Sequence, residues 1–372
     1  MTADLSAHPH FQSWTNPASG VRSFLLDPVI APIQQSFYYV NPSLTADESA
    51  LWFHCAWPPA RQKTLARVSL DPANPEVRHF PQAQFDTAQP LVAPDGGVWF
   101  GVGTSIHHLS ATGTTTRVFT LPEDYTRGRH LRLLATHLSL SADGTRFLLD
   151  GEIGNHWFVG TADLRTGKFT LIQEFMARHN HGQFSPVDPD TFLIAQDQHR
   201  DPVTGIFLHH TLRTWVMNTA GTRYECVNPA HRCFPYHGAC HEWWSADGWL
   251  CYIDYDQGVY EVNLQTGERN HLWKEPVCHA HCSRDRVHWC ADESPYFWKE
   301  KPCKVLYFNR KTGKRVEIQS AMEAPCGGSS EARSLYHIDP HPQFSPRDTW
   351  IVHTATPDDR PTVALTPVSE ME

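Results

Sequence analysis

The chain of 372 residues lacks any apolar run of about 18 residues, the length that a membrane-crossing helix needs. It also lacks an excess of basic residues: 31 Lys and Arg stand against 40 Asp and Glu, giving a net charge of -9. General nucleic-acid binding depends on a positive surface. We therefore expect no membrane span and no nucleic-acid partner. The first residues show no basic segment followed by an apolar one, so we expect no secretion signal and a cytoplasmic protein.

Several motifs of familiar enzymes are also missing. There is no GxSxG elbow, no phosphate-binding P-loop and no HExxH zinc motif. The ten Cys form no CxxC pairs, which a zinc ribbon would require. We interpret them as small buried thiols of a reducing compartment. A serine or cysteine nucleophile arrangement is not visible.

The sequence is rich in Trp and His, with 13 and 24 copies, and five of the His occupy one position of a repeat. The repeat reads His-x-x-x-Ser-x-Asp-Gly, and its His residues are His137, His181, His241, His279 and His341. Two further copies carry Asn41 and Gln89 at the same position. If the repeats surround a common axis, these seven side chains face one another. A ring of imidazoles predicts a metal site, a proton-transfer site, or both.

The segments between the repeats have the pattern of four-stranded units. An apolar strand-like run follows each Ser-x-Asp-Gly turn, and a third run often ends in Thr-Gly, as at Thr166-Gly167. The motif aspartates are spaced by 48, 48, 45, 59, 38 and 63 residues. Repeats of about 40–50 residues suit propeller blades, and longer intervals indicate loop insertions.

The sequence therefore predicts an all-β protein, a seven-bladed β-propeller with a single domain over residues 1–372. The strand-like segments at residues 21–26 and 361–368 have no blade of their own. We expect the N-terminal segment, residues 1–36, to contribute a closing strand that shares one blade with the C-terminal strand, because a propeller removes its free edges in this way.

Two segments concentrate possible metal ligands: Cys278-His279-Ala-His281-Cys282 and His337-Ile-Asp339-Pro-His341. In extended strands, residues two apart share a face, so each segment is expected to offer its His and Asp side chains together. The same alternation predicts that Cys278 and Cys282 point away. Nitrogen and oxygen ligands suit Mn, Fe, Ni or Zn better than Ca. The alternative is a polar strand entry solvated by the funnel.

Arg213 lies in a third-strand-like segment, Thr211-Leu-Arg213-Thr-Trp215. A fixed guanidinium beside His and metal would bind a carboxylate through two hydrogen bonds. The alternative is an exposed strand arginine. His199 follows a second strand, where loop residues often carry chemistry.

At these residues the chain resembles the oligogalacturonate lyases, a family of seven-bladed propeller polysaccharide lyases. His241-Glu-Trp-Trp-Ser-Ala-Asp-Gly is similar to the family's His-Glu-Phe-Trp-Ser-x-Asp-Gly. Arg213-Thr-Trp-Val-Met-Asn-Thr-Ala-Gly is similar to its Arg-Ile-Trp-x-Ile-Asn-Thr-Asp-Gly, and His341-Pro-Gln-Phe matches its His-Pro-x-Phe. The stretch from Gly182 to Asp190 resembles Pro-Gln-Phe-Ser-Pro-x-Asp-Pro.

The family cleaves short oligouronides by β-elimination, with a manganese-type ion held by three His and one Gln. The resemblance implies that His241 is the base, that Arg213 binds the substrate carboxylate, and that His279 and His341 are metal ligands. Where the family has a further ligand His, this chain has Asp339, and Tyr336 stands at the place of the Gln. His337 is expected to compensate. His281 is the alternative to His279 if the strand register differs.

We therefore expect a divalent metal, manganese first, and an oligouronide substrate cleaved to a 4,5-unsaturated uronate. His137, His181, His199 and His281 are the candidates for binding sugar, and the first three also for protonating the leaving oxygen. Two rival interpretations are a lyase for another uronate-containing glycan and a propeller that binds ligand or metal without catalysis. A lyase predicts Arg213 in the same funnel as the His ring, whereas a scaffold predicts it on an outer surface.

Overall fold

The structure is a computed structural model of the chain. It describes residues 4–85, 88–201, 203–208, 212–227, 239–293, 303–322, 336, 338–357 and 360–372.

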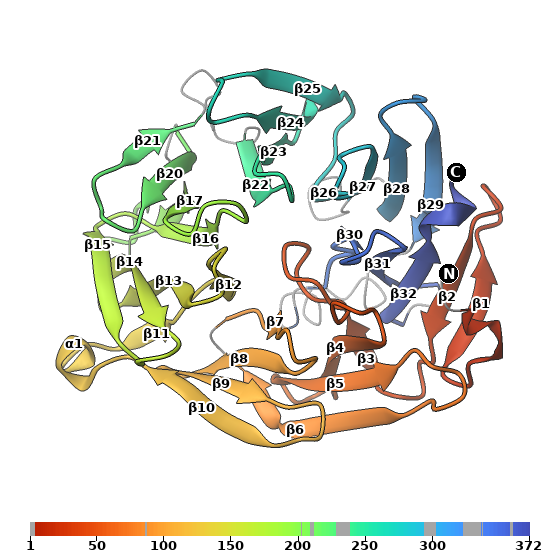
Figure 1. Ribbon diagram of the computed structural model, residues 1–372, viewed down its shortest axis with the longest axis horizontal. Helices are drawn as coiled ribbons and strands as arrows, with labels where there is room; N and C mark the ends of the chain where they lie inside the picture. The colour runs from red at the N-terminus through yellow and green to blue at the C-terminus, as the bar shows by residue number, and fades with distance from the viewer. Residues whose placement is uncertain are drawn as a thin grey trace.

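Seven antiparallel sheets of four or five strands stand around a central axis in these residues, as Figure 1 shows. The predicted seven-bladed β-propeller is therefore confirmed. The first three blades contain β3 (Ile33–Gln35), β4 (Ala50–Ala56), β5 (Lys63–Ser69) and β6 (Val77–Phe85); β7 (Leu91–Val92), β8 (Val98–Val102), β9 (Ser105–Leu109) and β10 (Thr115–Thr120); and β11 (Leu131–Leu133), β12 (Ser139–Leu140), β13 (Arg146–Ile153), β14 (His156–Asp163) and β15 (Phe169–Phe175).

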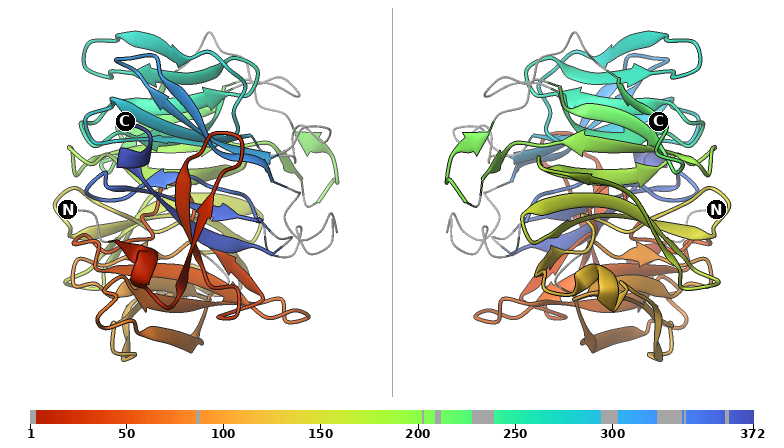
Figure 2. Two further views of the ribbon diagram at one scale, coloured as in Figure 1. Left: turned by 90° about the vertical axis from the view of Figure 1, so that its right-hand side faces the viewer. Right: turned by 90° about the vertical axis from the view of Figure 1, so that its left-hand side faces the viewer.

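The next three blades follow the same order from the axis outward. They contain β16 (His179–Phe184), β17 (Thr191–Gln196), β20 (Thr214–Asn218) and β21 (Tyr224–Cys226); β22 (Ala239–Trp244), β23 (Leu250–Asp254), β24 (Gly258–Val262) and β25 (Arg269–Trp273); and β26 (Ala280–Cys282), β27 (His288–Glu293), β28 (Cys303–Asn309) and β29 (Arg315–Met322). A separate hairpin, β18 (His199–Arg200) with β19 (Phe207–Leu208), interrupts the fourth blade and stands out from one face of the ring (Figure 2).

The seventh blade joins the two ends of the chain. Its strands are β30 (Gln343–Phe344), β31 (Trp350–Ala355), β32 (Thr362–Pro367), β2 (Arg22–Leu26) and β1 (Phe11–Thr15), in that order from the axis. The predicted closure by N- and C-terminal strands is thus confirmed, and Phe24 pairs with Leu365 across the junction.

The helical elements whose bounds lie in the described residues are α1 (Glu123–Thr126) and the short 3₁₀ turns η1 (Leu5–Ala7) and η2 (Val368–Glu370). None of the described helices is long and apolar enough to cross a membrane.

The Ser-x-Asp-Gly motif forms the turn between the first and second strand of a blade. The Ser141 hydroxyl donates to Asp143 Oδ1 at 2.6 Å and accepts from the Arg146 backbone N–H at 3.0 Å. Ser283 makes the same two bonds, to Asp285 and from His288. Because the turn satisfies its own polar groups, it fixes where each inner strand begins and ends.

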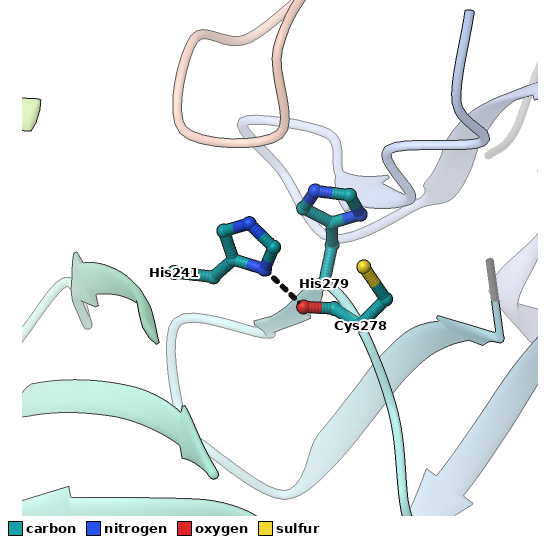
Figure 3. Close-up of side chains that lie close together, drawn as sticks. All are labelled: His241, Cys278 and His279. Atoms are coloured by element: carbon teal, nitrogen blue, oxygen red, sulfur yellow. Dashed lines mark hydrogen bonds between the residues drawn. The ribbon is translucent and has the colours of Figure 1, made fainter. Parts of the chain in front are cut away.

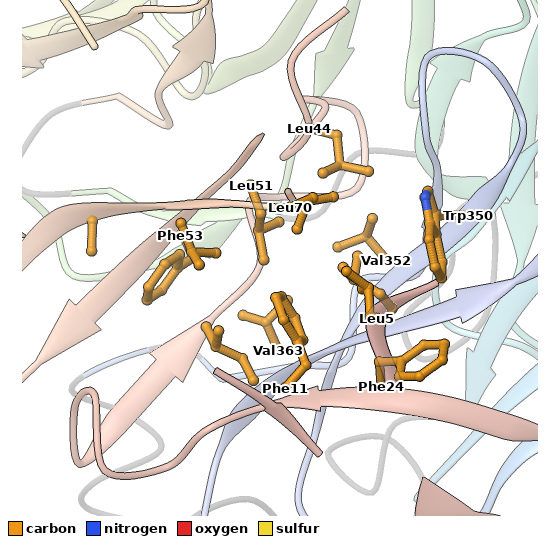
Figure 4. Close-up of a cluster of buried hydrophobic side chains, with 14 of the residues drawn as sticks. Leu5, Phe11, Phe24, Leu44, Leu51, Phe53, Leu70, Trp350, Val352 and Val363 are labelled. Carbon is orange, nitrogen blue, oxygen red and sulfur yellow. The ribbon is translucent and has the colours of Figure 1, made fainter. Parts of the chain in front are cut away.

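Apolar side chains fill the space between neighbouring blades. The cluster at the closing junction combines residues distant in sequence, Leu5, Phe11, Phe24, Leu44, Leu51, Phe53, Leu70, Trp350, Val352 and Val363 (Figure 4). Burial of such side chains from both ends of the chain provides the main driving force for closure.

Candidate active site and metal centre

The five motif histidines lie at the upstream ends of the inner strands and face the channel. Three of them have a left-handed backbone: φ is +55° at His181, +48° at His241 and +45° at His341. At His181 and His241 the strand pairing also shifts register, which marks a β-bulge. A bulge redirects one side chain out of the strand's alternation, and a non-glycine residue at positive φ costs about 1–3 kcal/mol. Three of the six non-glycine residues at positive φ in the described residues are therefore histidines of the ring.

Two tyrosines that the sequence analysis did not single out occupy the centre of this ring. The Tyr38 ring lies 4.9 Å from His341, 5.8 Å from His137 and 6.1 Å from His279, centroid to centroid. It also lies 6.1 Å from His181. Tyr39 follows it, and its hydroxyl donates to the Glu242 carbonyl at 3.2 Å. Burial raises the pKa of both tyrosines well above the usual range, so both phenols are neutral.

His241, His279 and His341 form a continuous row beside these tyrosines. The His241 and His279 rings stack at 4.1 Å, and His279 meets His341 edge to face at 4.4 Å. Cys278 joins them: one ligand atom from each of His241, Cys278 and His279 lies within 4.8 Å of the others (Figure 3). This group could hold a metal ion.

The expectation that Cys278 points away was wrong. Residues 278 and 279 precede β26, so the side-chain alternation of a strand does not apply to them. The same holds for the second segment: residues 338–342 precede β30 and are not extended as one strand. Asp339 and His341 therefore do not lie on one strand, and the argument that they share a strand face does not apply.

Asp292 on β27 orients the His row. Its carboxylate accepts from the His279 backbone N–H at 2.9 Å and lies 3.0 Å from Nδ1 of the same residue. It also accepts from the backbone N–H of His341 at 3.2 Å. Burial raises the pKa of Asp292 to about 7. The contact between Nδ1 and this carboxylate fixes the orientation of the His279 ring, as supporting carboxylates do for metal-bound histidines.

Arg213, just before β20, is buried rather than exposed on an outer surface. Its Nε donates to Glu242 Oε1 at 2.8 Å, and one terminal nitrogen donates to Asp197 Oδ1 at 2.6 Å. The Glu242 side chain is fully buried, whereas that of Asp197 is 21% exposed. The positive charge of Arg213 acts to lower the pKa of both His181 and His241. Arg213 therefore lies at the same end of the channel as the His ring.

His241 has a defined hydrogen-bond pattern. Its Nδ1 donates to the Cys278 carbonyl, and its Nε2 lies 3.4 Å from the Tyr255 hydroxyl. Burial lowers the pKa of His241, but the neighbouring Cys240 sulfur and the Cys278 carbonyl outweigh it, and the pKa is raised. His241 is also only partly buried, so a ligand in the channel can reach it.

The other predicted site residues are more scattered. His181 is partly exposed in the ring, and His137 is buried 6.1 Å from it. His199, the first residue of β18, packs against Trp157 at 4.7 Å, centroid to centroid. His281 accepts from the Phe344 backbone N–H at 3.1 Å, further along the channel. Asp339 is buried, and its charge acts on Lys63 and Cys278. His337 lies outside the described residues.

Comparisons with known proteins agree with this architecture. No family model matches the chain. Oligogalacturonate lyase of Dickeya dadantii (strain 3937) is 27% identical over 232 residues, 56% of this chain and 54% of that protein, so the match spans about half of its length. A solved oligogalacturonate lyase in complex with manganese aligns over 97% of each chain with a TM-score of 0.77 and 20% identity.

The oligogalacturonate lyase from Vibrio parahaemolyticus aligns over 96% of each chain, with a TM-score of 0.75 and 16% identity. At these identities the two structures show a shared fold. Together with the sequence match, they confirm the resemblance that the short motifs indicate.

Proposed function

We propose that the protein is a metal-dependent lyase that cleaves oligouronides, of the oligogalacturonate type, by β-elimination to a 4,5-unsaturated uronate. The observation that carries the proposal is the pairing of Arg213 with Glu242, the residue next to His241. This ion pair holds a guanidinium and a candidate base at one end of the same channel. The sequence similarity to the oligogalacturonate lyase of Dickeya dadantii supports the reaction class.

His241 is proposed to remove the proton at C5 of the uronate. Because its Nδ1–H is committed to the Cys278 carbonyl, the lone pair of the neutral ring is on Nε2. A positioned imidazole of this kind contributes about 10²–10⁴-fold to proton transfer. The electrons of the broken C5–H bond form the C4–C5 double bond, and the bond to O4 breaks.

Arg213 is proposed to bind the substrate carboxylate. Its Glu242 side is buried and fixed, while its Asp197 side faces a partly exposed carboxylate. A uronate carboxylate would take the place of Asp197 there and keep a charge-assisted hydrogen bond. Arginine fits this task because its planar fork matches a carboxylate.

The described donors fit a divalent cation. Asp292 orients the His279 ring through Nδ1, and the His341 ring lies 4.4 Å from it, centroid to centroid. His279, His341 and Asp339 would hold the ion, with His337 as a further proposed ligand, and an aspartate oxygen suits manganese at least as well as an imidazole. A bound ion would neutralise the carboxylate and the enolate-like charge that develops on it.

His181 and His199 remain the proposed residues for binding the oligouronide, and His137 and His281 are proposed to bind sugar further along the channel. Of these, His181 lies at the His241 end of the channel and is accessible, so it is the first to examine. A cytoplasmic protein acting on short imported oligouronides fits this substrate.

The test is the ultraviolet absorbance of the unsaturated product, with oligogalacturonides and Mn²⁺. We expect a rise that a chelator stops and added Mn²⁺ restores. His241→Ala should lower turnover by about 10²–10⁴-fold, while His108→Ala, at an outer-strand residue paired with Asp95, should not. Full activity of His241→Ala would remove it as the base. A parallel assay with glucuronate-containing oligosaccharides distinguishes the rival uronate substrates.

A further inference from the structure

A hollow lies on the channel axis, at the downstream ends of the inner strands. Its volume is about 390 Å³, within the size range of small-molecule sites. All seven blades contribute to its wall. Six of them do so chiefly through residues from two before the motif Ser, or its Ala counterpart, to one after it, and the first blade contributes Val40, Asn41 and Pro42. Among the described residues, His241, His279, His341 and Arg213 are not part of this wall.

Tyr38 contacts residues of both this hollow and the candidate active site. Its ring lies 5.8 Å from that of His137, 6.1 Å from that of His279 and 4.9 Å from that of His341, centroid to centroid. His137 lines the hollow, and so do Asn41 and its neighbours, which follow the tyrosines in the chain. The hollow and the His row are therefore distinct sites on one axis.

Three buried side chains in its wall have polar atoms without a hydrogen-bond partner. They are both ring nitrogens of His137, Oδ1 of Asn41 and the indole N–H of Trp243. Each of these residues is only 1% exposed. A buried polar atom without a partner costs about 1–3 kcal/mol, so four such atoms on three side chains of one wall indicate a partner that the protein itself does not supply.

The remainder of the wall is apolar and aromatic. It includes Trp99, Trp244, Leu140 and Phe344. The Trp244 indole is fixed by its N–H bond to the Gln183 carbonyl at 3.1 Å. Flat apolar faces beside a few polar atoms are the usual composition of a site for a small organic ligand.

Full charges are found only toward the rim of this wall. These are Arg284, which is exposed, and Asp348, whose carboxylate accepts from the Arg284 backbone N–H at 3.0 Å. Deeper in the wall, burial lowers the pKa of His137 to about 3, so its ring is neutral. An ion would meet no counter-charge at the three unpartnered groups.

We infer that this hollow binds an uncharged, hydroxyl-rich molecule of monosaccharide size. Its hydroxyls would donate to Asn41 Oδ1, accept from the Trp243 N–H and do either at His137, while its C–H faces pack on the indoles. This site does not depend on the proposed lyase activity. It would allow a neutral sugar to bind while the other end of the channel holds a uronate.

The test is calorimetric titration of the whole protein with D-galactose and D-glucose, with D-galacturonate as the charged comparison. We expect at least one neutral hexose to bind, and Trp243→Phe, which removes only the N–H, to weaken it by about tenfold. Trp289→Phe is the matched control: this buried tryptophan donates to the Arg286 carbonyl and does not line the hollow. If Trp243→Phe does not fold, Trp244→Ala removes a stacking face instead.

The inference is overturned if neither hexose binds up to about 100 mM, or if wild type and both wall variants bind equally well. It is also overturned if a crystal structure with hexose shows only ordered water in the hollow. Arg213→Lys separates this site from the other: it should weaken galacturonate binding and leave hexose binding unchanged. Loss of hexose binding in that variant places the hexose at the candidate active site and refutes the second site.

Discussion

At the scale of single residues, Arg213 and Glu242 depend on each other for charge compensation. Both are buried, and Nε of Arg213 donates to Oε1 of Glu242 at 2.8 Å. Removing one partner of a buried pair leaves an uncompensated charge, which costs about 3–5 kcal/mol. We expect Arg213→Met to lower the free energy of unfolding by about this amount, and the double variant Arg213→Met with Glu242→Gln to recover much of the loss. Urea denaturation measures both; additive losses would contradict the mutual dependence.

Asp292 offers a test of the metal centre that does not need turnover. Because its carboxylate holds His279 through both the backbone N–H and Nδ1, Asp292→Asn should disturb the ring without changing the side-chain volume. Loss of such a supporting carboxylate weakens metal binding by about 10–100-fold. Calorimetric titration with Mn²⁺ measures this. Asp254→Asn, at the same position of the preceding blade, is the control and should leave the affinity unchanged.

The His ring was predictable at this scale because each of its histidines lies four residues before the motif Ser. Tyr38, Glu242 and Asp292 were not predicted. Tyr38 lies three residues before the motif position of a blade that has Asn41 there instead of His. Asp292 lies nine residues after Ser283, on the next strand, and only the assembled ring shows that it reaches the neighbouring blade.

At the scale of elements, the second strands hold adjacent blades together around the channel. The residue nine after the motif Ser or Thr does this in several blades. Asp150 accepts from the Gly182 backbone N–H at 2.9 Å, Thr354 from that of Ser36 at 3.1 Å, and His54 lies 3.1 Å from the Gln89 side-chain oxygen. In each case the partner belongs to the following blade. The side chain at this position therefore connects two blades and does not only stabilise its own sheet.

Asp150 makes this assembly dependent on pH. Burial raises its pKa to about 6, from the ordinary value of 3.8. Between these two values the folded protein holds a proton that the unfolded chain has lost, so the stability from Asp150 falls as pH rises from about 4 to about 6 and is level above. The full change is about 3 kcal/mol. Asp150→Asn should flatten this part of the stability profile in urea denaturation, and an unchanged slope would contradict the assignment.

The sequence predicted the strand runs and the Asp-Gly and Thr-Gly turns, because those depend on local alternation and turn chemistry. Alternation failed at 278–279 and 338–342, where the chain enters the channel before pairing begins. Strict alternation of side chains also does not hold at the bulges of His181 and His241. The sequence around a bulge has no feature that predicts it, other than the functional residue itself.

At the scale of the whole molecule, the ring depends on one junction between distant parts of the chain. Only Phe24 and Leu25 of β2 pair with β32, yet the apolar cluster beneath them spans both ends of the sequence. We expect deletion of residues 1–27 to expose the β32 edge, lower the melting temperature and cause self-association. Light scattering and thermal unfolding measure this. A monomeric truncated protein with an unchanged melting temperature would show that the junction is dispensable.

The number of blades and their closure were predictable at this scale, since seven motif copies and two unmatched terminal strands leave few arrangements. The division of the channel into two ends was not predictable, because it depends on Tyr38 and Tyr39, which lie outside the repeated motif.

That division limits how a polymer can be handled. The Tyr38 ring packs against histidines from four blades, and this packing narrows the axis at that level. If the protein has the proposed lyase activity, we expect an oligouronide to enter and leave by one mouth instead of passing through the ring. The depth from that mouth to the tyrosines would then set how many sugar units lie beyond the cleaved bond.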